Sequence, residues 1–235
     1  LLDHLGPGLI TGAADDDPSG IATYSQAGAQ FGFAMLWSVF LTLPLMVGIQ
    51  IVSARIGRVS GHGLAANLRE HYPKWLMYFI VSLLLVANTI NIAADIGAMG
   101  EALQLVVGGP SHGHALVFGI VAILMQLFLP YSRLAPVLKW LTLALFAYVA
   151  VVFSVDVDWK AVALGTLLPP LNLTREYLML LVAVLGTTIS PYLFFWQASQ
   201  EVEEQRAADG EEPLKNAPEQ VKRNMRRIKV DTWIG

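Results

Sequence analysis

The sequence predicts an all-α, polytopic membrane protein, on the evidence of its composition and its apolar runs. Hydrophobic residues make up 55% of the 235 residues and charged residues only 14%, whereas a soluble domain averages roughly 25% charged residues. Five apolar runs each approach the roughly 17 to 25 residues that a spanning helix needs. They are Phe33–Val52, Trp75–Ile90, Ala115–Leu129, Val137–Val155 and Tyr177–Trp196. An interrupted run precedes them, so we expect six spans.

Three adjacent acidic residues interrupt this first segment. Asp15, Asp16 and Asp17 lie between the apolar runs Leu5–Ala14 and Ile21–Trp37. A carboxylate at the bilayer centre costs about 2.5 to 3.5 kcal/mol on insertion scales, so an intramembrane acidic residue is a candidate ion or proton site. Because three adjacent side chains point in different directions, we expect Asp15 or Asp16 to face a water-filled vestibule that attracts cations.

Pro18 and Gly20 follow the acidic residues and predict a break in the first helix, near residues 15–20. Proline removes a backbone donor and clashes with the preceding turn, which leaves carbonyl groups unpaired. Such carbonyls are tolerated at membrane depth only where they line a cavity or are otherwise satisfied. We therefore expect a cation to bind beside Asp17. The alternative is an outer turn in which the aspartates cap a helix.

The basic residues predict the orientation in the membrane. If the first segment runs outward, the loops after the second, fourth and sixth spans are cytoplasmic. These loops contain all of the 15 lysines and arginines except Lys160 and Arg175. An excess of Lys and Arg marks cytoplasmic loops. We therefore expect a cytoplasmic amino-terminal end, in an inner (plasma) membrane of bacterial type.

The sixth span contains a second candidate break near residues 187–191, between Gly186 and Pro191. Transporters with inverted repeats bind substrate at the bilayer midplane between paired discontinuous helices. Five spans separate equivalent points of the two breaks, and an odd number inverts the second repeat. We therefore expect a five-plus-five inverted repeat, of which the first repeat and the start of the second are present. The alternative is that Pro191 only kinks its helix.

The end of the sequence differs in composition from the rest. Residues 1–200 contain the six spans, and residues 201–230 mix acidic and basic residues densely, so we expect a charged, solvated cytoplasmic loop there. A lipid-headgroup patch at Lys222–Lys229 is the alternative. Residues 231–235 resemble the start of a seventh helix. Because the sequence also begins without methionine, we expect it to be a fragment.

Several motifs resemble the Nramp family of divalent-metal transporters, which share the LeuT-type fold. Gly6-Pro7-Gly8 and Asp17-Pro18-Ser19-Gly20 are similar to the first helix of that family, as is the following run Ala27–Gly32. The family's metal motif there reads Asp-Pro-Gly-Asn. In the sixth helix the family has Met-Pro-His, and Ser190-Pro191-Tyr192 takes that place here. The resemblance spans essentially the whole chain.

The resemblance implies a metal site between the two breaks. Asp17 matches the metal-binding aspartate, and Gly20 stands where the family has its ligand asparagine. Ser190 replaces the metal-binding methionine. Ala14 and Thr187 stand where the family offers backbone carbonyls, which survive a change of side chain.

The two replaced ligands imply a harder site. Methionine sulfur favours transition metals, whereas Gly20 and Ser190 leave a roomier site of oxygen atoms and water. The chain also has no cysteine. Mg²⁺ keeps several waters and uses one or two carboxylates. We therefore expect Mg²⁺, with Mn²⁺ tolerated, as the transported substrate, and no cofactor.

The resemblance also bears on proton coupling. The family's third helix has an aspartate and a glutamate on its proton path, and Asn91 and Ala94 match those positions, with Asp95 one residue displaced. The family's sixth-helix histidines match Tyr192 and Gln197. None of these four replacements titrates near neutral pH, so we expect uncoupled transport. Asp95 could still carry a proton if it faces the interior; it shares a helical face with Asn91.

Three other functions stay open from the sequence. The first is an ordinary proton-coupled Mn²⁺/Fe²⁺ importer of the same family, and the second is a Na⁺-coupled amino-acid permease of the same fold. The third is a membrane scaffold that has lost transport. An enzyme is not expected, because the sequence shows no nucleophile–base pair, phosphate loop or metal-hydrolase spacing. The expected partners are a divalent metal ion and the lipid bilayer, without nucleic acid.

Overall fold

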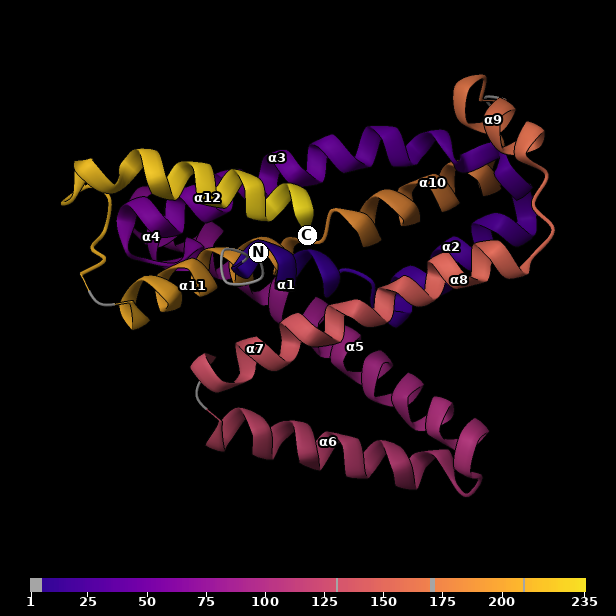
Figure 1. The fold of residues 1–235 in the computed structure, drawn as a ribbon, viewed down its shortest axis with the longest axis horizontal. Helices are drawn as coiled ribbons and strands as arrows, with labels where there is room; N and C mark the ends of the chain where they lie inside the picture. The colour runs from indigo at the N-terminus through magenta and orange to yellow at the C-terminus, as the bar shows by residue number, and fades with distance from the viewer. Residues whose placement is uncertain (1–5, 130, 170–171, 209) are drawn as a thin grey trace.

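The computed structural model describes residues 6–129, 131–169, 172–208 and 210–235 (Figure 1). These residues form helices and no strands, which confirms the all-α prediction. The α-helices are α1 (Pro7–Ala13), α2 (Pro18–Phe31), α3 (Trp37–Ser60), α4 (Leu64–His71), α5 (Lys74–Val107), α6 (Ser111–Phe128), α7 (Tyr131–Leu141), α8 (Phe146–Ser154), α9 (Trp159–Leu167), α10 (Arg175–Thr188), α11 (Pro191–Ala207) and α12 (Val221–Ile234). Short 3-10 turns are η2 (Gly32–Met35), η3 (Thr142–Leu145) and η4 (Pro218–Gln220).

Five helical segments of the described chain are long and apolar enough to cross a membrane. They are Trp37–Ser60, Lys74–Val107, Ser111–Phe128, Arg133–Ser154 and Arg175–Ala207. The protein is therefore an integral, multi-pass membrane protein, as predicted. The first segment is not among the five, because it consists of the two shorter helices α1 and α2.

The first segment and the segment Arg175–Ala207 are each interrupted just before a proline. Helix α1 ends at Ala13 and α2 begins at Pro18, while α10 ends at Thr188 and α11 begins at Pro191. Proline suits the first position of a helix because the N–H that it lacks would have no partner there. After each interruption the next helix therefore begins at a proline without loss of a helical hydrogen bond.

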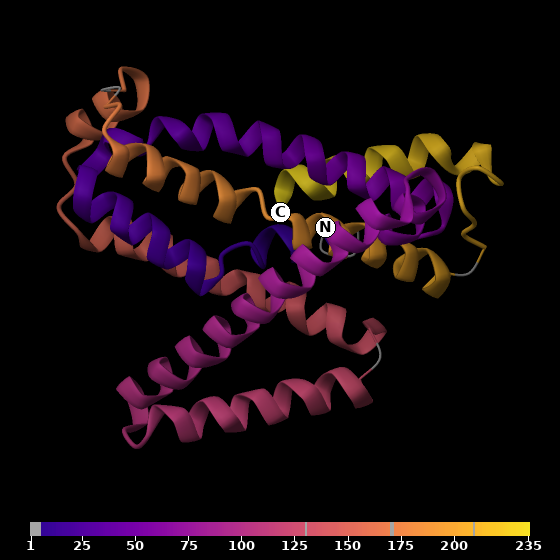
Figure 2. The same cartoon turned by 180° about the vertical axis from the view of Figure 1, so that it is seen from behind.

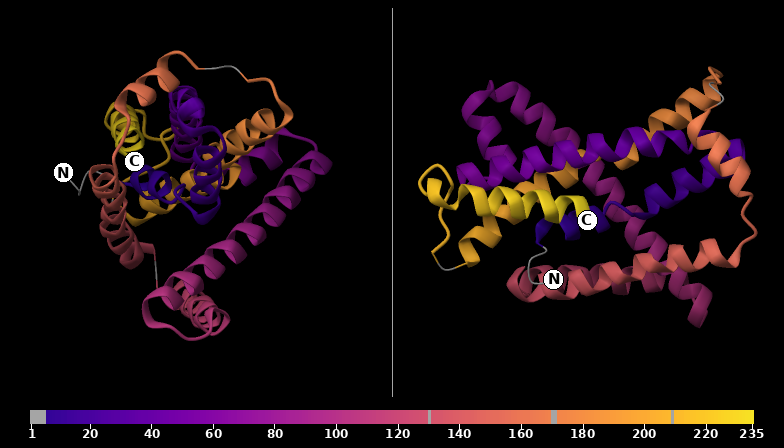
Figure 3. Two further views of the ribbon diagram at one scale, coloured as in Figure 1. Left: turned by 90° about the vertical axis from the view of Figure 1, so that its right-hand side faces the viewer. Right: turned by 45° about the horizontal axis from the view of Figure 1, so that its top comes forward.

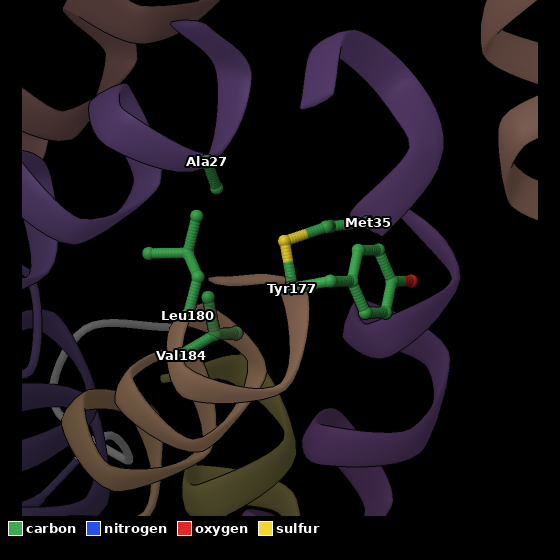
Figure 4. Packing of buried hydrophobic residues seen from close by; sticks show 5 residues of the cluster. All are labelled: Ala27, Met35, Tyr177, Leu180 and Val184. Atoms are coloured by element: carbon green, nitrogen blue, oxygen red, sulfur yellow. The ribbon is translucent and has the colours of Figure 1, made fainter. Parts of the chain in front are cut away.

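An apolar cluster joins the first interrupted segment to the second. Its members are Ala27, Met35, Tyr177, Leu180 and Val184, contributed by α2, η2 and α10 (Figure 4). The Tyr177 hydroxyl also accepts a 2.8 Å hydrogen bond from the indole nitrogen of Trp37. These contacts hold α2 and α10 side by side, so both interruptions face the same region of the molecule.

Helices α5 and α6 form an antiparallel hairpin that projects away from the other helices (Figures 2 and 3). Helix α5 has 34 residues, which at a rise of about 1.5 Å per residue gives a length of about 51 Å. Gly100 allows the hairpin to close, because a Cβ there would lie 2.9 Å from the Cβ of Ala115. Most apolar side chains of the hairpin are exposed, including Leu105 and Leu127.

The charged segment after the sixth span differs from the expected solvated loop. Helix α11 continues through Ala207, and α12 begins at Val221, ten residues before the expected start of a new helix. Figure 1 shows α12 lying along α3. Glu201 is fully buried in this packing. Burial is tolerated because Arg227 bonds to Glu201 at 2.5 Å and to Glu204 at 2.6 Å.

The carboxylate of Asp231 connects the end of α12 to the start of α1. It accepts hydrogen bonds from the backbone N–H groups of Gly6 at 2.7 Å, Gly8 at 2.6 Å and Leu9 at 3.2 Å. Asp231 is fully buried. It supplies acceptors for helix-terminal donors that have no intrahelical partner, and so fixes α1 against α12.

Candidate metal site

Asp17 lies at the first interruption, where its carboxylate caps α2. Its backbone is extended, with φ −91° and ψ 166°, and its Oδ1 accepts a 2.9 Å hydrogen bond from the Gly20 N–H. Ser19 Oγ donates a second hydrogen bond to the same oxygen at 2.6 Å. Capping of this kind satisfies donors at a helix start. It also fixes the direction of the second carboxylate oxygen.

Oδ2 of Asp17 points toward two other helices. It accepts a hydrogen bond from the Tyr192 hydroxyl of α11 at 2.7 Å and one from the Asn91 amide of α5 at 3.4 Å. Asp17 is only 9% exposed. The carboxylate therefore lies at a point where α2, α5 and α11 converge.

The second interruption borders the first. Ser19 Oγ of α2 lies 3.3 Å from Thr187 Oγ1 of α10. A Cβ at Gly20 would meet Thr187 Oγ1 at 3.6 Å and Asp17 Oδ1 at 3.7 Å, in ordinary contact. Asp17, Gly20 and Thr187 are thus brought together. Ser190 is buried nearby in sequence, but its hydroxyl donates to the Thr187 carbonyl at 2.7 Å, within its own interruption.

A cavity of about 520 Å³ opens in front of Asp17. Its polar lining combines residues from the first interruption with a stripe of α5. Asp95 is part of that stripe, and its Oδ1 has no hydrogen-bond partner among the described residues. The lining consists of Ala14, Asp17, Leu84, Asn88, Asn91, Ile92, Asp95, Tyr192, Phe195, Trp196 and Ser199.

The remaining predicted residues lie in different surroundings. Asp15 is half-buried, and its Oδ1 has no partner among the described residues. Asp16 is exposed. Gln197 is fully buried and accepts a hydrogen bond from Thr11 of α1, and it does not line the cavity.

Some site residues escaped the sequence analysis. Ser19, Phe195, Trp196 and Ser199 touch Asp17 or line its cavity, yet none was singled out. The i, i+3 and i+4 spacing from Phe195 or Trp196 to Ser199 was a usable signal, because such residues share a face of a helix.

The donor set at Asp17 defines what it can bind. In the described part of the chain, no group of three or more His, Cys, Asp or Glu residues gathers around one point. A cation at Asp17 would meet that carboxylate, neutral hydroxyl and amide groups, and water, with the Asp95 carboxylate in the lining of the same cavity. Hard cations accept such oxygen ligands.

Fold and site together define a class: a multi-pass membrane protein in which two discontinuous helices meet at a buried carboxylate. The sequence model described as "Natural resistance-associated macrophage protein-like" (Nramp) matches residues 8–235. The chain belongs to the Nramp family, which confirms the resemblance found in its motifs.

Two curated relatives are named as metal cation transporters. Two proteins from Klebsiella pneumoniae, from strain ATCC 700721 / MGH 78578 and from strain 342, are named "Divalent metal cation transporter MntH". Each is 31% identical to this chain over 204 residues, which cover 84% of the chain and 48% of the relative. The chain spans about half the length of the curated relatives it matches.

A solved structure shows the same fold. The crystal structure of the Eremococcus coleocola manganese transporter, in complex with an aromatic bis-isothiourea substituted compound, matches with a TM-score of 0.74 at 19% identity. The match covers 99% of this chain and 48% of that one. It confirms the predicted LeuT-type, polytopic fold.

Proposed function

We propose that this protein transports divalent metal cations by alternating access, and that it binds a hard ion, Mg²⁺ or Mn²⁺, between its two interrupted helices. Membership of the Nramp family and the names of the curated relatives support the general part of this proposal. Because the chain spans about half of those relatives, the transport activity belongs to the proposal. No catalytic activity is part of it.

The observation that carries the proposal is the setting of Asp17. A buried carboxylate at a helix interruption, in contact with a cavity and surrounded by neutral oxygen and amide groups, is a suitable site for a dehydrating cation. Ser190 stands where the family has a methionine, so the site lacks a thioether sulfur, which favours hard ions. The proposed ligands are Asp17, the Ala14 and Thr187 carbonyls and water, with Ser190 and Gly20 leaving space.

We further propose that transport is not coupled to protons. Asn91, Tyr192 and Gln197 do not titrate near neutral pH. Asp95 is the exception, because it lines the cavity and its Oδ1 has no hydrogen-bond partner in the described part of the chain. In liposomes, Mg²⁺ uptake should leave the lumenal pH unchanged. Acidification that accompanies uptake, and that Asp95→Asn abolishes, would contradict this part of the proposal.

The orientation is also a proposal. A cytoplasmic amino-terminal end in a bacterial-type plasma membrane accounts for the distribution of lysine and arginine. In this orientation α12 and the Arg227 ion pairs lie on the cytoplasmic side. Labelling of a single cysteine introduced at the exposed Lys222 should require permeabilised cells.

One alternative has specific support. A proton-coupled Mn²⁺/Fe²⁺ importer would agree with the MntH name and with the manganese transporter of similar fold. Uptake by the full-length protein in liposomes separates the two functions. Uptake of Mg²⁺ supports the hard-ion proposal, and uptake of Mn²⁺ and Fe²⁺ without Mg²⁺ supports the importer. Uptake of Fe²⁺ or Cd²⁺ with neither Mg²⁺ nor Mn²⁺ would refute the hard-ion proposal.

A further inference from the structure

We propose that the hydroxyl oxygen of Tyr192 is a cation ligand that selects small octahedral divalent ions over larger ones. This inference rests on the proposed function and assigns a role to one residue of the same site. Tyr192 lies in the first turn of α11, and its hydroxyl is the nearest group to the outward oxygen of Asp17.

The two oxygens of Asp17 have different tasks. Oδ1 accepts hydrogen bonds from Ser19 and Gly20, both in the first turn of α2, so it is committed to the helix start. Among the described residues, the partners of Oδ2 come from α5 and α11. A cation entering from the cavity therefore meets Oδ2, and the Tyr192 hydroxyl is already beside it.

The spacing of these two oxygens suits a small ion. Oxygens at neighbouring corners of an octahedron are separated by about 1.4 times the metal–oxygen distance, which gives about 2.9 Å for Mg²⁺ and about 3.3 to 3.7 Å for Ca²⁺. The Tyr192 hydroxyl and Asp17 Oδ2 are 2.7 Å apart. To bind Mg²⁺, the distance between the two oxygens must increase by about 0.2 Å, whereas to bind Ca²⁺ it must increase by about 0.6 Å or more.

A contact between the two interruptions resists such widening. Ser19 Oγ of α2 lies 3.3 Å from Thr187 Oγ1, at the end of α10 and five residues before Tyr192 in the chain. Ser19 also donates to the other oxygen of Asp17. Separating Oδ2 from the phenol oxygen would strain this contact.

The hydroxyl can change role without moving its oxygen. A phenol group both donates and accepts hydrogen bonds. In the absence of a cation it donates to Oδ2, and when a cation binds it can turn its proton away and present a lone pair. The cavity of about 520 Å³ has room for the waters that Mg²⁺ retains. No proton needs to leave the protein in this exchange.

The test is calorimetric titration of Mg²⁺, Mn²⁺ and Ca²⁺ into the full-length protein and its Tyr192→Phe variant. We expect Mg²⁺ and Mn²⁺ to bind the variant about tenfold more weakly, in the range of one hydrogen bond to a charged group, with Ca²⁺ affinity unchanged. Tyr24→Phe is the control, because it removes a hydroxyl at the same interruption that does not contact Asp17. It should keep the preference for Mg²⁺.

A spectroscopic measurement does not depend on the folding of the Phe variant. Saturating Mg²⁺ should change the tyrosine absorbance of the unmodified protein and of Tyr24→Phe equally. The inference is overturned if Asp17-dependent Mg²⁺ binding produces no such change, or if Tyr192→Phe alters the Mg²⁺ and Ca²⁺ affinities by the same factor. If the unmodified protein binds none of these ions, or binds them without Asp17, the proposed function itself fails.

Discussion

The ion pairs of Arg227 allow a quantitative prediction for Arg227→Met. The guanidinium bonds to Glu201 at 2.5 Å and to Glu204 at 2.6 Å. Glu201 is fully buried, and its other oxygen has no partner among the described residues. Removal of one partner from a buried pair costs about 3 to 5 kcal/mol. The Glu204 side chain is 35% exposed. Loss of its ion pair with Arg227 therefore adds about 1 kcal/mol at most to the cost of the substitution.

The assay is thermal unfolding of the full-length protein in detergent. In a full-length protein as long as the curated relatives, a loss of about 3 to 5 kcal/mol should lower the midpoint by roughly 3 to 6 °C. Arg226→Met is the matched control, because Arg226 is exposed on the same helix, and it should change the midpoint by less than about 2 °C. Combining Arg227→Met with Glu201→Gln should recover most of the stability, since no buried charge is left unpaired.

The reasoning is refuted if Arg227→Met is no more harmful than Arg226→Met. It is also refuted if Glu201→Gln fails to improve the Arg227→Met protein. Either result would mean that Glu201 is not a buried charge whose stability depends on Arg227.

Two further changes test the site and the packing. Gly20→Asn combined with Ser190→Met places an amide and a thioether beside Asp17. The double variant should bind Mn²⁺ and Cd²⁺ more tightly relative to Mg²⁺. An unchanged order of affinities in competition binding would argue against these positions as ligand positions. Gly57→Ala should destabilise the protein by about 1 to 3 kcal/mol in thermal unfolding, because the new Cβ would collide with the Ala198 carbonyl of α11. Gly28→Ala is the control and should not be destabilising, because no described atom lies within 4 Å of a Cβ at that position.

The positions of the interruptions could be read from the sequence, because proline next to acidic or small residues has a local effect on the helix. The length of α5 could not be predicted from the sequence. Its apolar run ends at Ile90, since Asn91 and Asp95 follow, yet the helix continues to Val107. These polar side chains are tolerated because they face the cavity at Asp17, and this fact belongs to the tertiary structure.

The candidate site was partly predictable for the same reason. Asp17 is distinguished by its position inside an apolar segment, and Gly20 and Thr187 followed from the family resemblance. Ser19 joins the site through the fold, by its hydrogen bond to Asp17, and Trp196 was accessible from the sequence only through its helical spacing to Ser199. The pairing of Arg227 with Glu201 was also hidden, since it joins residues 26 positions apart on two helices that the sequence does not pair.

The central claim is that Asp17 binds a hard divalent cation. Calorimetric titration of Mg²⁺ and Mn²⁺ into the full-length protein tests it most directly, with Asp17→Ala as the test variant and Asp16→Ala, at an exposed neighbour, as the control. We predict saturable Mg²⁺ binding that Asp17→Ala abolishes and Asp16→Ala retains. Absence of Mg²⁺ binding, or equal binding by the Asp17→Ala protein, would contradict the account.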